Sequence, residues 1–224
     1  MATSGTYVFS PGFGDFISNA YGLCGIRRTD LTQQHMADAR LQANFMLAEW
    51  ANRQVNLWTV DLQEVPLFQG IATYDVPEST IAILDVYIWN GVQDRLIFPI
   101  SRSDYAALPN KDTQAPPTTY WSDRLISPEI TLWQVPDQDD VYTLKYYRCR
   151  QIQDANAGTD PEMPYRWFDA FNFGLASRLA IMYAPDRAQT LVPRAEMSWQ
   201  LAAKQDIETG VPIYISPGLA GYFR

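Results

Sequence analysis

The sequence has few of the side chains on which most enzyme active sites and metal sites depend. It contains one histidine, His35, and two cysteines, Cys24 and Cys149. A Ser/His/Asp hydrolase needs a histidine beside its nucleophile, and the Gly-x-Ser-x-Gly turn that often carries the serine is missing. The cysteines lie far apart and in no Cys/His cluster, so we expect free, buried thiols. No catalytic residue, metal or cofactor is therefore predicted.

The chain also lacks an excess of positive charge. It has 17 Lys and Arg against 25 Asp and Glu, for a net charge of −8. Binding to nucleic acid needs a basic face that releases counterions from the phosphates, so a protein that grips DNA or RNA is not expected. An acidic surface would instead let DNA pass without sticking.

Long apolar runs are missing as well. No window approaches the roughly 18 apolar residues of a membrane span, and residues 1–10 lack the basic start and apolar core of a signal peptide. We therefore expect no membrane contact and synthesis in a cytosol. Apolar residues still make up 47% of the chain, enough for a substantial core. The 7 Trp, 13 Tyr and 10 Phe favour additional contacts between subunits.

Residues 1–55 show helical periodicity. The stripe of a first helix is Phe13, Ile17, Ala20 and Cys24. Gly25 follows it and is expected to form the C-cap. Asp30 is the expected N-cap of a second helix. The stripe of that helix is Met36, Ala39, Ala43, Met46 and Trp50. His35 lies one position off this stripe, which favours a boundary side chain over a catalytic base.

Residues 56–150 show strand-like alternation of β-branched and aromatic residues. Trp58, Val60 and Leu62 are expected on one face of the first strand. Further strands are expected at Ile81–Trp89, Arg95–Ile100, Ile130–Val135 and Val141–Tyr147. Turn signals separate them, among them Asn90-Gly91 and a proline-rich loop over 108–118. The pattern predicts roughly five to seven short antiparallel strands in a small sandwich or barrel.

Residues 151–210 return to helical periodicity. One helix is predicted from Trp167, Phe171, Leu175, Leu179 and Met182. Another, after Pro185-Asp186, is predicted from Leu191, Ala195, Trp199 and Ala202. Pro193 is expected to bend it or to begin it, and Gly210 to end it. The expected fold class is α+β, an antiparallel helical bundle of N- and C-terminal helices with an inserted antiparallel β-sandwich or barrel.

Residues 211–224 predict an extended arm, because prolines and glycines forbid a helix while apolar side chains dominate. A segment of this kind gains stability in a groove or as an added strand, so we interpret it as a docking arm. The alternative is that it packs on its own domain. The residues expected to make the contacts are Pro212, Tyr214, Ile215, Pro217, Leu219, Tyr222, Phe223 and Arg224.

Two further groups of residues are candidate sites. Asp139-Asp140 and Asp160 with Glu162 are the nearest carboxylate pairs for glycoside cleavage, although a hairpin loop and a helix N-terminus explain them more simply. The second group forms a loop after the strand ending at Ile100 and could grip a sugar or a neighbouring subunit. Its candidate contact residues are Arg102, Tyr105, Leu108, Asn110, Lys111, Tyr120 and Trp121.

An ordered set of short motifs resembles the podophage head-to-tail adaptor family, also called tail tubular protein A or head-completion proteins. The motifs of the first helices are Cys24-Gly25-Ile26, residues 42–50 (QANFMLAEW) and Leu57-Trp58. Those of the middle are residues 74–77 (YDVP), 100–102 (ISR), 104–105 (DY), 108–111 (LPNK) and 132–136 (LWQVP). Those of the end are residues 161–164 (PEMP) and 174–180 (GLASRLA). The resemblance covers roughly residues 13–208.

The resemblance implies a structural protein of the virion neck, assembled in the host cytoplasm. It implies a ring of about twelve copies between the portal protein and the tail nozzle or next tail protein, with DNA passing through the lumen. The arm would then reach the portal, and the β part would meet the tail. Two alternatives stay open at this point, a peptidoglycan- or polysaccharide-degrading tail enzyme and a carbohydrate-binding β module.

Overall fold

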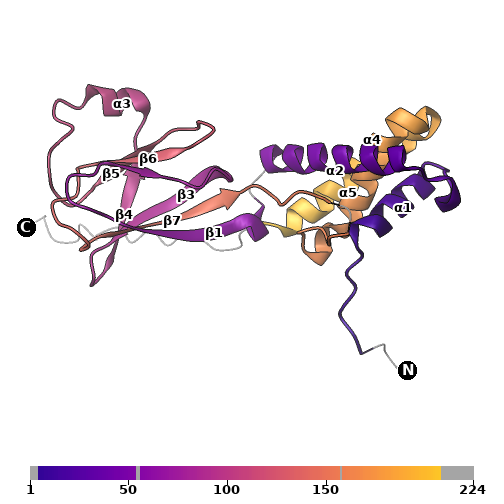
Figure 1. Cartoon of the computed structure of the whole chain (residues 1–224), viewed down its shortest axis with the longest axis horizontal. Helices are drawn as coiled ribbons and strands as arrows, with labels where there is room; N and C mark the ends of the chain where they lie inside the picture. The colour runs from indigo at the N-terminus through magenta and orange to yellow at the C-terminus, as the bar shows by residue number, and fades with distance from the viewer. Residues whose placement is uncertain (1–4, 54–55, 157, 208–224) are drawn as a thin grey trace, which may run out of the picture.

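The computed structural model describes residues 5–53, 56–156 and 158–207, and its fold is α+β as expected. Figure 1 shows an elongated molecule, with most helices gathered at one end and the strands at the other. Both ends of the chain contribute to the helical end. There α1 (Phe13–Leu23) and α2 (Gln33–Arg53) share one core with α4 (Phe168–Tyr183) and α5 (Pro185–Gln205).

Helix α1 ends at a glycine, as the sequence predicts. Gly25 has a φ of +85°, a conformation that costs an L side chain free energy. The Ile26 N–H donates to the Tyr21 carbonyl at 2.9 Å. This is the hydrogen bond of a Schellman motif that spans more residues of the chain. Arg187, near the start of α5, donates to the Leu23 carbonyl at 2.9 Å. The end of α1 is therefore held by its own turn and by a second helix.

Helix α2 begins at Gln33, and the expected cap at Asp30 is wrong because Asp30 lies in a short 3-10 turn. Thr32 takes the capping position instead. Its hydroxyl accepts from the His35 N–H at 3.4 Å, and its own N–H donates to His35 Nδ1 at 3.1 Å. This reciprocal pair has the form of a capping box with histidine in place of glutamate. His35 therefore stabilises a helix end.

Helix α4 is the centre of the helical end. Its buried residues lie on all sides of the helix, which is typical of a helix surrounded by others. The predicted stripes form the core, except that Met36 and Met182, near helix ends, stay at the surface and Ala195 is only half-buried. Ala184 alone separates α4 from α5, and α5 continues through Pro193 as one helix.

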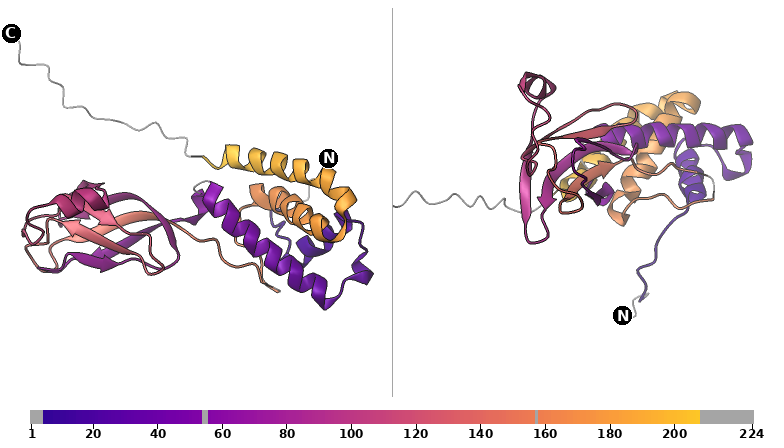
Figure 2. Two further views of the ribbon diagram at one scale, coloured as in Figure 1. Left: turned by 90° about the horizontal axis from the view of Figure 1, so that it is seen from above. Right: turned by 60° about the vertical axis from the view of Figure 1, so that its left-hand side comes forward.

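The other end of the molecule is a curled seven-stranded sheet (Figure 2). Its strands are β1 (Val60–Pro66), β2 (Thr73–Asp75), β3 (Thr80–Trp89), β4 (Asp94–Pro99), β5 (Thr119–Ser122), β6 (Glu129–Trp133) and β7 (Thr143–Arg150). Their spatial order is β1-β7-β3-β4-β5-β6-β2. The four longer strands after β1 were predicted within a few residues.

The expectation of a purely antiparallel sandwich or barrel is wrong, because the strands form one mixed sheet. β4 and β5 pair in parallel, with Phe98 opposite Thr119, while the other neighbours are antiparallel. The connection over 100–118 includes the short helix α3 (Arg102–Ala107). A connection of that length can cross back and place the next strand parallel to the last. Alternation in a sequence does not report the direction of the partner strand.

The face predicted for β1 is also wrong. Leu62 is 39% exposed, and Trp58 lies before the strand in a 3-10 turn that packs on the helical core. The inward positions of β1 include Asp61, whose carboxylate accepts from Arg148 Nε at 2.7 Å. Arg148 is 7% exposed and the Asp61 side chain is 35% exposed, so the arginine is buried and the carboxylate lies at the rim of the sheet. A charge that is satisfied by a partner can occupy an inward position that the apolar pattern assigns to leucine.

Among the described residues, no helix combines the length and the apolar character that crossing a membrane requires.

Candidate functional site

The predicted contact loop begins with α3, at the end of the molecule far from the helical core (Figure 1). A capping box holds the start of this helix. The Asp104 N–H donates to Ser101 Oγ at 3.0 Å, and the Ser101 N–H donates to Asp104 Oδ2 at 3.3 Å. These two bonds satisfy donors that the first turn leaves unpaired, so a helix of only six residues keeps its shape.

Two aromatic rings form the surface of the loop. Tyr105 of α3 stacks on Trp121 of β5, with centroids 5.8 Å apart and planes 22° apart. The Lys111 ammonium lies 5.7 Å from the Tyr105 ring centre and donates to the Leu108 carbonyl at 3.2 Å. The stack remains partly exposed. A pre-ordered aromatic surface of this kind loses little entropy when it binds a protein partner.

Most of the other predicted loop residues surround this stack. Trp133 Nε1 donates to the Asn110 carbonyl at 3.0 Å, which fastens the loop to β6. The side chains of Arg102 and Asn110 are exposed, and Leu108 is half-buried. Tyr120 differs, because it alternates with Trp121 on β5 and is only 3% exposed, inside the sheet core. Tyr120 is therefore withdrawn from the predicted contact surface.

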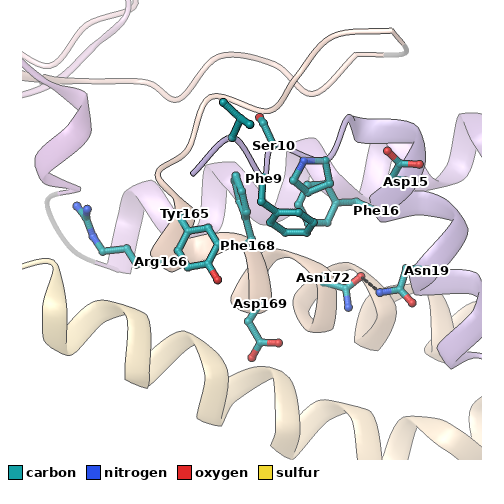
Figure 3. A pocket seen from close by; sticks show the side chains of 12 residues that line it. Phe9, Ser10, Asp15, Phe16, Asn19, Tyr165, Arg166, Phe168, Asp169 and Asn172 are labelled. Atoms are coloured by element: carbon teal, nitrogen blue, oxygen red, sulfur yellow. Dashed lines mark hydrogen bonds between the residues drawn. The ribbon is translucent and has the colours of Figure 1, made fainter. Parts of the chain in front are cut away.

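The sequence did not reveal an aromatic cavity at the helical end. Its volume is about 770 Å³, and Figure 3 shows its lining side chains. Phe168 packs edge-on against Phe16 at 5.6 Å and against Phe9 at 6.2 Å, measured between ring centres. Asp15 and Asp169 contribute carboxylates from separate helices. These residues come from 8–19 and 165–172, so only the tertiary fold brings them together.

A charged cluster ties the two ends of the molecule together. Arg150, at the end of β7, binds Glu162 through Nη1 at 2.9 Å and lies 3.7 Å from the Asp61 carboxylate. The hydrogen bond from Arg150 is the main reason that the pKa of Glu162 lies below its usual range. Burial raises the pKa of Asp61, but hydrogen bonds from Arg148 and Gln63 outweigh it, so that pKa is lowered too. Both carboxylates are therefore stabilised as anions.

The end of α5 is fastened to the same junction. Asp206 is 2% exposed and forms an ion pair with Arg166. Its second carboxylate oxygen accepts from the Leu57 N–H at 3.2 Å. Nearby, Trp58 Nε1 donates to the Glu162 carbonyl at 3.1 Å. These contacts connect the last helix with the segment that enters the sheet.

One carboxylate of each pair that is a candidate for catalysis has a structural partner. Glu162, with its lowered pKa, is held as an anion by Arg150 and is unsuited to donate a proton. Asp139 accepts from the Gln69 N–H at 2.7 Å and so closes a loop. Over the described ranges, no cluster of His, Cys, Asp and Glu has a geometry that could hold a metal ion. The two cysteines are free and buried, as expected.

The predicted docking arm, 211–224, lies outside the described residues, so its contacts stay a prediction.

A family model described as SU10 adaptor protein matches residues 13–211, which includes all the helices and strands above. No curated protein matches the chain.

Proposed function

Because the chain belongs to the SU10 adaptor protein family, we propose that it acts as one copy of a ring in the neck of a phage virion. The family is one of structural head-to-tail adaptors rather than enzymes, as the sequence resemblance predicts. The proposed ring has about twelve copies with cyclic symmetry. It lies between the portal protein and the tail nozzle or next tail protein, and DNA passes through its lumen.

The observation that carries this proposal is the family match across both ends of an elongated molecule (Figure 1). A connector must bind two different partners at once, so it needs two separated surfaces. The helical end and the Tyr105–Trp121 surface are separated in this way. In the proposed arrangement the helical end lies toward the portal and the sheet end toward the tail.

The charge of the chain supports a channel for DNA. At −8 per copy, a ring would carry a net charge on the order of −100. A negatively charged channel wall repels the DNA phosphates and recognises no base sequence. A DNA duplex would therefore slide past it without a specific binding site.

The arm over 211–224 is proposed to bind the portal. Its aromatic and proline-rich composition suits an extended segment that lies in a groove of a partner. Asp206, which is fastened at the junction just after α5, precedes the arm in the sequence by only a few residues.

Mixing the full-length chain with its portal and weighing the product by light scattering tests the proposal. We expect a complex that contains one portal and about twelve copies of the chain. A chain that stays monomeric in the presence of the portal would contradict it.

The arm is tested by removing 211–224. We expect this variant to keep the melting temperature of the full chain and to lose portal binding, because the arm is proposed to lie in a groove of the portal rather than on its own domain. Trp121→Ala is the matched control, since it changes the opposite end of the molecule and should leave portal binding intact. If the truncated chain binds the portal as tightly as the full chain, the arm is not the portal contact.

A further inference from the structure

Two pairs of exposed apolar side chains lie on the outer surfaces of two helices. On α2, Leu41 is 51% exposed and Phe45 is 55% exposed. On α5, Met197 is 54% exposed and Leu201 is 55% exposed. Single exposed apolar residues are common, but side chains four residues apart lie next to each other on one helix face. Each helix therefore carries a continuous apolar strip.

Both strips point away from the core. The buried positions of α2 include Ala39, Ala43 and Trp50, and those of α5 include Leu191 and Ala202. At 100° per residue, the α2 strip lies on the opposite side of its helix from these buried positions, and the α5 strip lies roughly 100–120° around its helix from Leu191 and Ala202. Within the described chain, the strips thus add nothing to the core.

The two strips lie on different sides of the molecule. Helix α4 packs against both α2 and α5, and the left view of Figure 2 shows α4 between them. Each strip lies on a side of its helix that the core does not cover, so the α2 strip and the α5 strip point in different directions. One subunit cannot bring its own two strips together.

The charges beside the strips are of opposite sign. Asp38 lies one turn before Leu41 on α2, where Gln34 donates to it at 3.0 Å. Arg194 and Lys204 are exposed and lie one turn before Met197 and one turn after Leu201 on α5. An acidic residue beside one strip and basic residues beside the other favour pairing between unlike strips over pairing between like ones.

We propose that the α2 strip of one copy packs against the α5 strip of the next copy, and that this contact closes the ring. The inference rests on the proposed ring and names the surface that forms it. A closed ring needs head-to-tail contacts between two different surfaces of each subunit. In a ring of about twelve copies, each subunit is rotated by only about 30° relative to its neighbour. The two contact surfaces of a subunit must therefore lie on nearly opposite sides of it.

Cysteine cross-linking of the full-length chain, assembled on its portal, tests the contact. Cys24 and Cys149 are 4% and 2% exposed, so the native thiols contribute little background. One cysteine is placed on each strip, at Leu41 or Phe45 and at Met197 or Leu201. Testing all four combinations allows for the unknown register, because a disulfide forms only where the Cα atoms come within about 7 Å.

Head-to-tail pairing predicts a specific pattern. At least one double variant, such as Phe45→Cys with Leu201→Cys, should give a ladder of cross-linked oligomers. The single variants alone should give monomers, and a mixture of the two should give only dimers. Val192→Cys with Phe45→Cys is the matched control, because Val192 is also exposed on α5, at 46%, but on a different face. It should give no ladder.

Three results would overturn the proposed contact. A single variant that cross-links to itself would mean that like strips pair. A ladder in the Val192 control would mean that cross-linking does not depend on the face. Portal-bound rings without a ladder in any of the four double variants would place the contact elsewhere while the proposed function stands. The proposed function itself fails only if the unmodified chain forms no ring, which light scattering of the same samples reports.

Discussion

At the scale of single residues, several polar and special residues of this chain hold helix ends and junctions. Gly25 ends α1, His35 and Thr32 cap α2, and Asp206 fastens the end of α5. Each satisfies backbone or carboxylate groups that would otherwise lose their hydrogen bonds on folding. The single histidine therefore has a structural explanation.

Gly25→Ala tests the cap of α1. A Cβ at this position would meet a φ of +85° and lie 2.9 Å from Arg187 Cζ. We expect the free energy of unfolding to fall by about 1–2 kcal/mol, the usual cost of a left-handed L residue. Chemical denaturation measures it. Gly22→Ala is the control, because its Cβ would meet no atom within 4 Å and alanine favours the helix. Equal stability of both variants would contradict the prediction.

The junction carboxylates predict how stability depends on pH. The pKa values of Glu162 and Asp61 are lowered in the folded protein. Their contribution to stability is therefore complete above their unfolded pKa values, about 4, and is lost as pH falls through the folded values. The Arg150→Met substitution removes the guanidinium group that lies beside the carboxylates of both Glu162 and Asp61. We expect it to cost about 1.5–3 kcal/mol at pH 7, the range for hydrogen bonds to charged groups.

Urea unfolding of wild type and Arg150→Met at pH 7, 4 and 3 checks this dependence. The difference between the two proteins should shrink as pH falls, because protonated carboxyl groups no longer pair with Arg150. Arg40→Met serves as the control, since Arg40 is exposed within α2, away from the junction residues. A difference that stays constant from pH 7 to pH 3 would mean that Arg150 acts through packing alone.

At the scale of elements, the packing of α2 against α4 explains a glycine in the middle of α4. A Cβ on Gly174 would collide with Met46 Sδ, and Met46 is 2% exposed. The absence of a side chain at 174 therefore lets α2 and α4 pack closely. Residues 174–180 carry part of the family resemblance. Helix packing explains why the first residue of this motif is glycine.

Gly174→Ala should destabilise the protein although alanine favours helices. We expect a net loss, because overpacking costs about 1–3 kcal/mol and the helix preference returns only about 1 kcal/mol. In a Met46→Ala background the same change should be neutral or stabilising, since the clash is gone. Thermal unfolding of the four proteins in this cycle measures the coupling. Purely additive effects would show that the two side chains do not compete for space.

At the scale of the whole molecule, the two ends are expected to act separately. Trp121→Ala removes one ring of the stack with Tyr105 at the sheet end. It should leave the ring on the portal intact and reduce attachment of the next tail protein by about tenfold or more, as loss of an aromatic contact of at least about 1.4 kcal/mol would. Binding of the tail protein to preassembled portal complexes measures it.

Trp89→Ala is the control for Trp121→Ala. Trp89 is also a partly buried tryptophan of the sheet and lies 5.2 Å from the Lys145 ammonium, outside the contact loop. It should leave tail attachment unchanged. If both variants attach the tail protein normally, the sheet end contacts its partner through another surface.

The sequence alone determined what depends on local pattern and composition. Stripes such as Ala39, Ala43 and Trp50 located the helices, alternation located four strands, and Gly25 located a cap. The scarcity of histidine and cysteine and the ordered motifs predicted a structural adaptor, which the family match supports. These features are local because helix and strand periods repeat within a few residues.

Only the tertiary structure decided what depends on partners far away in the chain. It showed β4 and β5 to be parallel, placed Tyr120 inside the core and brought the aromatic cavity together. It also turned Asp61 inward, because Arg148, distant in sequence, neutralises it. Burial and strand direction depend on which distant segments meet. For the same reason, Leu41 and Phe45 became recognisable as an outward strip only once the opposite face of α2 was seen to fill the core.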